Sequence, residues 1–195
     1  MKAIERLFGC LDEEINQFRE TTGIFCASGC GKCCNKADIE ASPLEFLPLA
    51  FYWFLRHEAI TKLEQLQNNI SPTCIVYSPL SIENITKGSC ETYLYRGLIC
   101  RLFGYAATTD KYGDMRLVTC KLIKENQAEN YSKAITLLKQ KEYVPIFSDY
   151  YKKLMQIDFY LGNQIMPIND ALKKALEIVL NYYSYRPFPK FKKAV

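Results

Sequence analysis

Four cysteines crowded into one short loop-like stretch constrain the fold of this chain more than any other feature of its 195 residues. Two glycines separate the cysteines of FCASGCGKCC, which are Cys26, Cys30, Cys33 and Cys34. A glycine costs about 1 kcal/mol in a helix interior, whereas it lets a backbone bend tightly. The stretch therefore predicts a loop that wraps around something, in preference to a helix with a buried stripe of thiols.

Disulfide bonds are the second interpretation of the cysteines. The first twenty residues carry several acidic side chains and no continuous apolar run, so we expect no signal peptide and a cytoplasmic protein, in which thiols stay reduced. The total of nine cysteines is odd, and a bond between the neighbours Cys33 and Cys34 would be strained. Both observations favour metal binding over disulfides.

A metal site fits the cysteines best, because thiolates are soft ligands that suit zinc or an iron–sulfur cluster. Cys10 is set aside as a core residue of the first helix, which leaves eight predicted metal ligands: Cys26, Cys30, Cys33, Cys34, Cys74, Cys90, Cys100 and Cys120. Eight thiolates fit two four-sulfur sites, and the side chains of Cys33 and Cys34 are expected to diverge toward different sites. A single site with spare cysteines stays open.

Basic residues near the cysteines supply a second argument. A divalent ion held by four thiolates carries a net charge of −2, which needs compensation from surrounding groups. Arg96 and Arg101 flank Cys100, and a guanidinium can donate hydrogen bonds to sulfur and lower a thiol pKa. We therefore predict that these arginines contribute to cofactor binding. The alternative is that they are surface residues paired with Glu83 or Glu91.

Hydrophobic periodicity predicts helices toward both ends of the chain. The first, over about residues 2–20, has an apolar stripe, and the second opens with a capping box formed by Ser42 and Glu45, with Pro43 at its first position. Further helices are expected at about 59–69, 125–140, 145–162 and 168–185. Between them, residues 71–120 contain short β-prone runs such as GYAATT and MRLVT, joined by the turn DKYGD.

The predicted fold class is mainly α with a small irregular or β cysteine-rich metal-binding centre, an α+β arrangement with few short strands. We expect a single domain over residues 1–195. The cysteine-cluster region covers about residues 25–120, the C-terminal helical part covers about 121–185, and a basic and aromatic tail covers 186–195. The tail is expected to be solvated or, as the alternative, to be a docking segment.

Other chemistries find little support in the sequence. His57, the only histidine, is expected in the core or at a helix end and not as a general base, and Asp12, Glu13 and Glu14 are expected to form a solvated helix face. No apolar run reaches the ~18 residues that span a bilayer, and the net charge of +4 is mild. We expect no membrane and no nucleic acid among the partners, which are a metal ion or cluster and, as an alternative, a protein docked on the C-terminal helices.

Four segments of the chain together resemble the CxxCxxCC cysteine-cluster proteins, a family regarded as zinc- or iron-chelating. The segments are CASGCGKCC, SPLE at the start of a helix, CIVYSPL and CETYLYRGLICRLFG. The last motif of the family pairs a cysteine and a tyrosine with Arg-Pro and Cys-Arg, which Cys90, Tyr93 or Tyr95, Arg96, Cys100 and Arg101 resemble here. Gly97 stands in the place of the proline.

The resemblance covers roughly residues 25–105, with Cys120 as an extension, and it implies metal chelation without implying a reaction. A similar cysteine cluster occurs in flagellin lysine methylases, whose chains are longer. The alternative function is therefore an iron–sulfur-dependent protein-modifying enzyme, similar to a lysine methylase, or a redox protein. Whether the protein is an enzyme is left open by the sequence.

Overall fold

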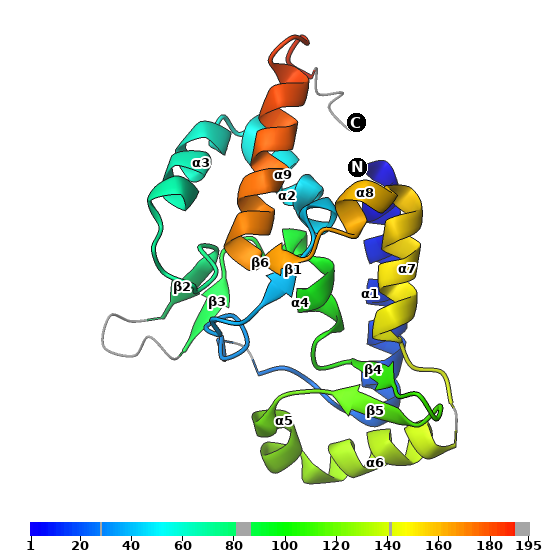
Figure 1. Ribbon diagram of the computed structural model, residues 1–195. Coiled ribbons are helices and arrows are strands. Elements are labelled where there is room, and N and C mark those ends of the chain that lie inside the picture. Colours follow the sequence, from blue (N-terminus) through cyan, green and yellow to red (C-terminus); the bar gives the residue numbers. More distant parts are fainter. Residues whose placement is uncertain (28, 81–86, 141, 190–195) are drawn as a thin grey trace, which may run out of the picture.

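Helices form most of the protein, and short antiparallel strand pairs connect them (Figure 1). The structure is a computed structural model that describes residues 1–27, 29–80, 87–140 and 142–189. The helices are α1 (Lys2–Thr22), α2 (Pro43–Leu55), α3 (Ala59–Asn68), α4 (Leu98–Leu102), α5 (Lys121–Asn126), α6 (Ala128–Lys139), α7 (Phe147–Ile157), α8 (Phe159–Gly162) and α9 (Ile168–Tyr183), with the 3-10 turn η1 at Tyr93–Tyr95. The predicted class, mainly α with few short strands, is confirmed.

The strands lie in pairs that tie distant parts of the chain together. They are β1 (Glu40–Ala41) with β6 (Met166–Pro167), β2 (Tyr77–Pro79) with β3 (Gly88–Cys90), and β4 (Ala106–Thr109) with β5 (Met115–Val118). The β4–β5 hairpin confirms the strands predicted from GYAATT and MRLVT. The β1–β6 pair, in contrast, joins residues more than a hundred positions apart, which no local pattern indicates.

One hydrophobic cluster forms around α1, which packs against α4, α6, α7 and the β4–β5 hairpin. Its predicted apolar stripe is buried, with Ile4, Phe8, Leu11, Ile15 and Phe18 in the core. The expectation that Cys10 belongs to this core is wrong, because its thiol is exposed. Cys10 lies one position before Leu11 of the apolar stripe. Because each residue advances an α-helix by about 100°, the Cys10 side chain points away from the stripe.

A second hydrophobic cluster is formed by α2, α3 and α9. The predicted capping box of α2 is present, with Glu45 reaching back to Ser42 and Pro43 in the first turn. On α9, the stripe that faces α2 and α3 contains Ala171, Leu172, Ala175, Leu176 and Val179, all buried. Leu47 of α2 packs against both clusters, so α2 connects the two halves of the core.

Two of the predicted helices are each divided in the structure. The helix expected at 125–140 is α5 and α6, which meet at Gln127, and the helix expected at 145–162 is α7 and α8, which meet at Asp158. Asp158 takes an extended backbone conformation with φ −154°, and its carboxylate accepts a hydrogen bond from the backbone N–H of Leu161 at 2.9 Å. It therefore ends one helix and caps the next.

His57 lies just beyond the end of α2, one of the two places expected for it, and is exposed. Its ring stacks on Phe188, with the ring centroids 4.8 Å apart, and Phe188 also contacts Phe54. The described part of the tail thus folds back onto α2, while residues 190–195 lie outside the described residues. Along the part of the chain that the structure describes, no helix is long and apolar enough to cross a membrane.

Candidate metal centre

The loop between α1 and β1 carries the first four cysteines, and its start is held by long-range hydrogen bonds. The Gln127 side chain accepts from the backbone N–H of Phe25 at 3.0 Å and donates to the Phe25 carbonyl at 2.7 Å. The backbone N–H of Cys26 donates to the Tyr105 hydroxyl at 2.9 Å. Gln127 lies at the break between α5 and α6, which places its side chain beside the backbone of Phe25. No sequence pattern indicates that Gln127 or Tyr105 would hold this loop.

Glycines bring the second half of this loop against the β2–β3 hairpin. Gly29 and Gly31 have positive φ values of 69° and 57°, a region that favours glycine. The Gly29 carbonyl accepts from the backbone N–H of Gly88 at 3.1 Å. A Cβ on Gly31 would lie 2.6 Å from the Tyr77 ring and 2.8 Å from backbone atoms of Gly88. The predicted loop is confirmed, and here it wraps around a hairpin.

We expect Gly31→Ala to lower the free energy of unfolding by about 3 kcal/mol, because it combines left-handed strain with a backbone overlap that cannot relax cheaply. Gly113→Ala is the matched control, since Gly113 has φ 89° but no atom within 4 Å of its added Cβ. The control is expected to lose only ~1 kcal/mol from strain. Equal losses in urea denaturation of the two variants would contradict the close packing at Gly31.

The remaining cysteines of the predicted set converge on the loop from separate elements. Cys74 precedes β2, Cys90 ends β3, Cys100 lies in α4 and Cys120 precedes α5. In Figure 1 the loop between α1 and β1 runs beside the β2–β3 hairpin. Cys120 packs against the first hydrophobic cluster and the others against the second, so these thiols flank both halves of the core. All nine cysteines are free thiols.

Electrostatic coupling joins Cys26 to three other thiols. Burial raises the pKa of the Cys26 thiol to about 11, and the negative charges of Cys33, Cys30 and Cys120 as thiolates raise it further against the lowering effect of Arg19. The first cysteine set is therefore Cys26, Cys30, Cys33 and Cys120. Cys26 thus lies within range of the charges of Cys30, Cys33 and Cys120, although Cys120 is far away in the sequence.

A second cysteine set is coupled in the same way, and its members are Cys34, Cys74, Cys90 and Cys100. Burial and then the charges of Cys74, Glu45 and Cys90 raise the pKa of the Cys100 thiol well above its usual value. Burial raises the pKa of Cys74 to about 11, with a further contribution from Cys90. Desolvation thus favours the neutral form of the thiols at these positions. A cation bound nearby would stabilise the thiolate form.

Cys33 and Cys34 connect the two sets. Their sulfur atoms lie 3.8 Å apart and share a hydrogen bond, which lowers the pKa of Cys33 and raises that of Cys34. The expectation that these neighbouring side chains diverge is therefore wrong, because the turn closed by Cys34 N–H and the Gly31 carbonyl brings them together. Because their sulfur atoms lie this close, the two sets are adjacent, with Cys33 in the first and Cys34 in the second.

The eight thiols do not form a closed set of metal ligands in the part of the chain that the structure describes. Among the described residues, no three Cys, His, Asp or Glu side chains converge closely enough to hold a metal ion. The structure brings the predicted ligands into one region, and whether they act as ligands stays a prediction. An all-sulfur donor set of this kind suits zinc or iron over hard cations.

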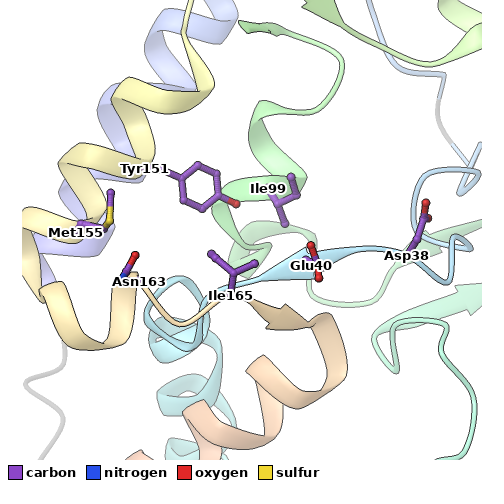
Figure 2. Close-up of a pocket in the computed structure, with 8 residues that line it drawn as sticks. Asp38, Glu40, Ile99, Tyr151, Met155, Asn163 and Ile165 are labelled. Atoms are coloured by element: carbon purple, nitrogen blue, oxygen red, sulfur yellow. The ribbon is translucent and has the colours of Figure 1, made fainter.

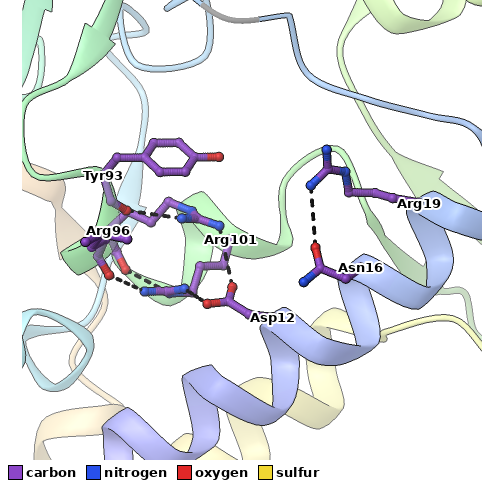
Figure 3. Close-up of polar contacts among 7 residues, drawn as sticks. Asp12, Asn16, Arg19, Tyr93, Arg96 and Arg101 are labelled. Atoms are coloured by element: carbon purple, nitrogen blue, oxygen red, sulfur yellow. Dashed lines mark hydrogen bonds and ion pairs between the residues drawn. The ribbon is translucent and has the colours of Figure 1, made fainter.

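Arg96 and Arg101 bind Asp12 on α1 (Figure 3). The Arg101 side chain is only 5% exposed, and it donates to Asp12, to the Leu94 carbonyl at 2.6 Å and to the Arg96 carbonyl at 3.1 Å. Among the described residues the acidic partner of both arginines is Asp12 and not Glu91, while Glu83 lies outside the described residues. Asp12 is accordingly not part of a merely solvated helix face, which corrects that expectation.

Glu14 corrects the same expectation, because the hydroxyls of Tyr143 and Tyr150 both donate to its carboxylate.

Arg96 and Arg101 differ in their effect on the pKa values of the cysteine thiols. Arg96 lowers the pKa of the Cys90 thiol, against the larger effect of burial, as expected for a compensating charge. Arg101 is held by oxygen acceptors, and its own pKa is lowered by burial.

Glu45 fixes the element that carries Cys100. Its carboxylate is fully buried and accepts from the backbone N–H of Ser42 at 2.8 Å through one oxygen and from that of Ile99 at 2.9 Å through the other. Burial raises the Glu45 pKa to about 7 in spite of these hydrogen bonds. The sequence indicates the contact with Ser42 but gives no sign of the contact with Ile99, since α4 itself was not predicted.

Comparison with known proteins adds no further assignment. No protein family, no curated protein and no solved structure matches this chain. The resemblance to the CxxCxxCC cluster proteins therefore stays a prediction that depends on the four quoted segments.

Proposed function

We propose that this protein binds zinc or an iron–sulfur cluster through its cysteines, in two neighbouring sets of four. The first set is Cys26, Cys30, Cys33 and Cys120, and the second is Cys34, Cys74, Cys90 and Cys100. The observation that carries the proposal is that thiols from separate segments lie within range of one another's charge, with the sulfurs of Cys33 and Cys34 in contact in a loop shaped by glycines. Free cysteines that only fill a core have no need of such mutual proximity.

The chemistry of the donor set supports this function. Metal binding requires thiolates, and burial together with mutual repulsion keeps most of these thiols neutral in the absence of a cation. Cys33 is the exception, because the hydrogen bond from Cys34 stabilises its thiolate. We infer that Cys33 binds its metal first and that the other thiols of the first set then close around that metal.

The roles of the other residues follow from their contacts. Arg96 offsets part of the thiolate charge, while Arg101 and Glu45 fix α4 and thereby Cys100. Bound zinc would supply folding energy to the irregular middle of the chain, whereas a cluster would also supply a redox couple. The proposal implies a reducing compartment, the cytoplasm, because the thiols must stay free.

The test is the content of zinc, iron and acid-labile sulfide in protein purified without oxygen, together with its visible absorption spectrum. A colourless sample with one or two zinc ions per chain would support a chelating or structural role. A brown sample with matching iron and sulfide would support a cluster and bring forward the alternative, an iron–sulfur-dependent modifying enzyme or a redox protein. No metal at all, with nine titratable thiols, would contradict the proposal.

Docking of another protein on the C-terminal helices stays a prediction. Its physical basis is the exposure of large apolar side chains there, such as Phe159, Tyr160 and Tyr182. Scattered exposed residues of this kind are also common on protein surfaces, so the metal function is the conclusion that the structure supports best.

A further inference from the structure

An open pocket of about 500 Å³ lies on the side of α4 that faces α7 (Figure 2). It is lined by α4, by the β1 segment, by α7 and α8, and by the stretch that leads from α8 to β6. A volume of this size accommodates a small molecule. Its lining residues are distinct from the eight cysteines of the proposed metal centre.

Two carboxylates, those of Asp38 and Glu40, give the pocket a negative charge. Glu40 begins β1 and Asp38 lies two positions before it, and both residues line the pocket. Among the described residues neither carboxylate forms an ion pair, and no lysine or arginine contributes to the lining. The negative charge is therefore available to a ligand.

The rest of the lining is apolar or neutral. Ile99, Met155 and Ile165 provide the aliphatic surface, and Figure 2 shows the Tyr151 ring reaching from α7 toward Ile99 and Glu40. A tyrosine hydroxyl is neutral at pH 7 and can accept a hydrogen bond, so Tyr151 adds a neutral acceptor to the lining. The lining thus combines hydrogen-bond acceptors with apolar walls.

We propose that this pocket binds a small aliphatic amine as its ammonium cation, with the charge beside Asp38 and Glu40 and the carbon chain against Ile99 and Ile165. A metal ion is disfavoured because most of the wall is apolar, and an anion is disfavoured by the two carboxylates. An alkylammonium group satisfies both parts of the lining at once. The proposal is independent of the metal function, since it uses none of the cysteines.

The test is a titration of ¹⁵N-labelled protein with n-pentylamine at pH 7, followed by NMR. We expect saturable shifts of the amides of Ile99, Gly162, Asn163 and Ile165, and weaker binding of the neutral n-pentanol. Asp38→Asn and Glu40→Gln are each expected to raise the dissociation constant about fivefold, the upper end for an exposed charge pair. Both side chains are exposed, so these variants are expected to fold.

Glu64→Gln is the matched control, because it removes one exposed carboxylate from α3, which contributes nothing to the lining. Its affinity for n-pentylamine is expected to equal that of the unaltered protein. Equal binding of n-pentanol, unchanged affinity in both pocket variants, or shifts scattered over the surface would each overturn the proposal.

Discussion

Replacing Cys100 by serine is expected to remove the metal bound by the second cysteine set and to lower the melting temperature by about 10 °C. In a chain of this size that shift corresponds to ~3 kcal/mol. The reason is that Cys100 lies half-buried in α4, within range of the charges of Cys74, Cys90 and Cys34, so its loss removes one of the four thiols of the second set. Elemental analysis and thermal melting of the purified variant measure both effects.

Cys10→Ser is the control for this substitution. It makes the same chemical change at an exposed thiol of α1 that belongs to neither set, so metal content and melting temperature are expected to stay unchanged. The comparison is repeated after treatment with a chelator. If Cys100→Ser lowers the melting temperature of the metal-free protein by the same amount, the effect is one of packing and the role of Cys100 as a ligand is refuted.

Replacing Arg101 by alanine is expected to lower the free energy of unfolding by about 3 kcal/mol, the low end for loss of one partner of a buried ion pair. Asp12 is 40% exposed, which limits the cost of leaving its carboxylate without Arg101. The substitution also leaves the carbonyls of Leu94 and Arg96 without this donor and removes the cation stacked on Phe8. Urea denaturation measures the loss.

Arg96→Ala separates stabilisation from charge compensation. Arg96 is more exposed than Arg101, and its contact with Asp12 is longer at 3.5 Å, so we expect a loss of only ~1 kcal/mol. Its effect on Cys90 predicts instead a weaker metal affinity, measured by competition with a chelator. If Arg101→Ala weakened metal binding without changing the stability of the metal-free chain, the role assigned to Arg101 would be wrong.

The helices were predictable because their signals are local. The stripe from Ile4 to Phe18 and the capping box at Ser42 depend on residues a few positions apart, and such spacing dictates which face of a helix is apolar. The glycines of the cysteine loop were informative for the same reason. A positive φ is a property of one residue, and glycine adopts it most readily.

For the candidate site, the sequence indicates residue types but not their arrangement. The sequence pointed to eight cysteines and two arginines near them, but it could not group the thiols or find Asp12 as the partner of both arginines. The pairing of the Cys33 and Cys34 sulfurs was predicted wrongly, because the turn that brings them together depends on packing between Gly31 and the β2–β3 hairpin.

The sequence by itself determined the helical class and the loop character of residues 25–34, and its cysteines are the basis of the metal-binding prediction. Only the tertiary structure decided which thiols meet, which acid neutralises Arg101, and that Glu45 joins α2 to α4. The physical reason is the distance along the chain over which each interaction acts. Periodicity and glycine conformations act over a few residues, whereas Gln127 with Phe25, or Arg101 with Asp12, come together only when two hydrophobic clusters pack around the loop.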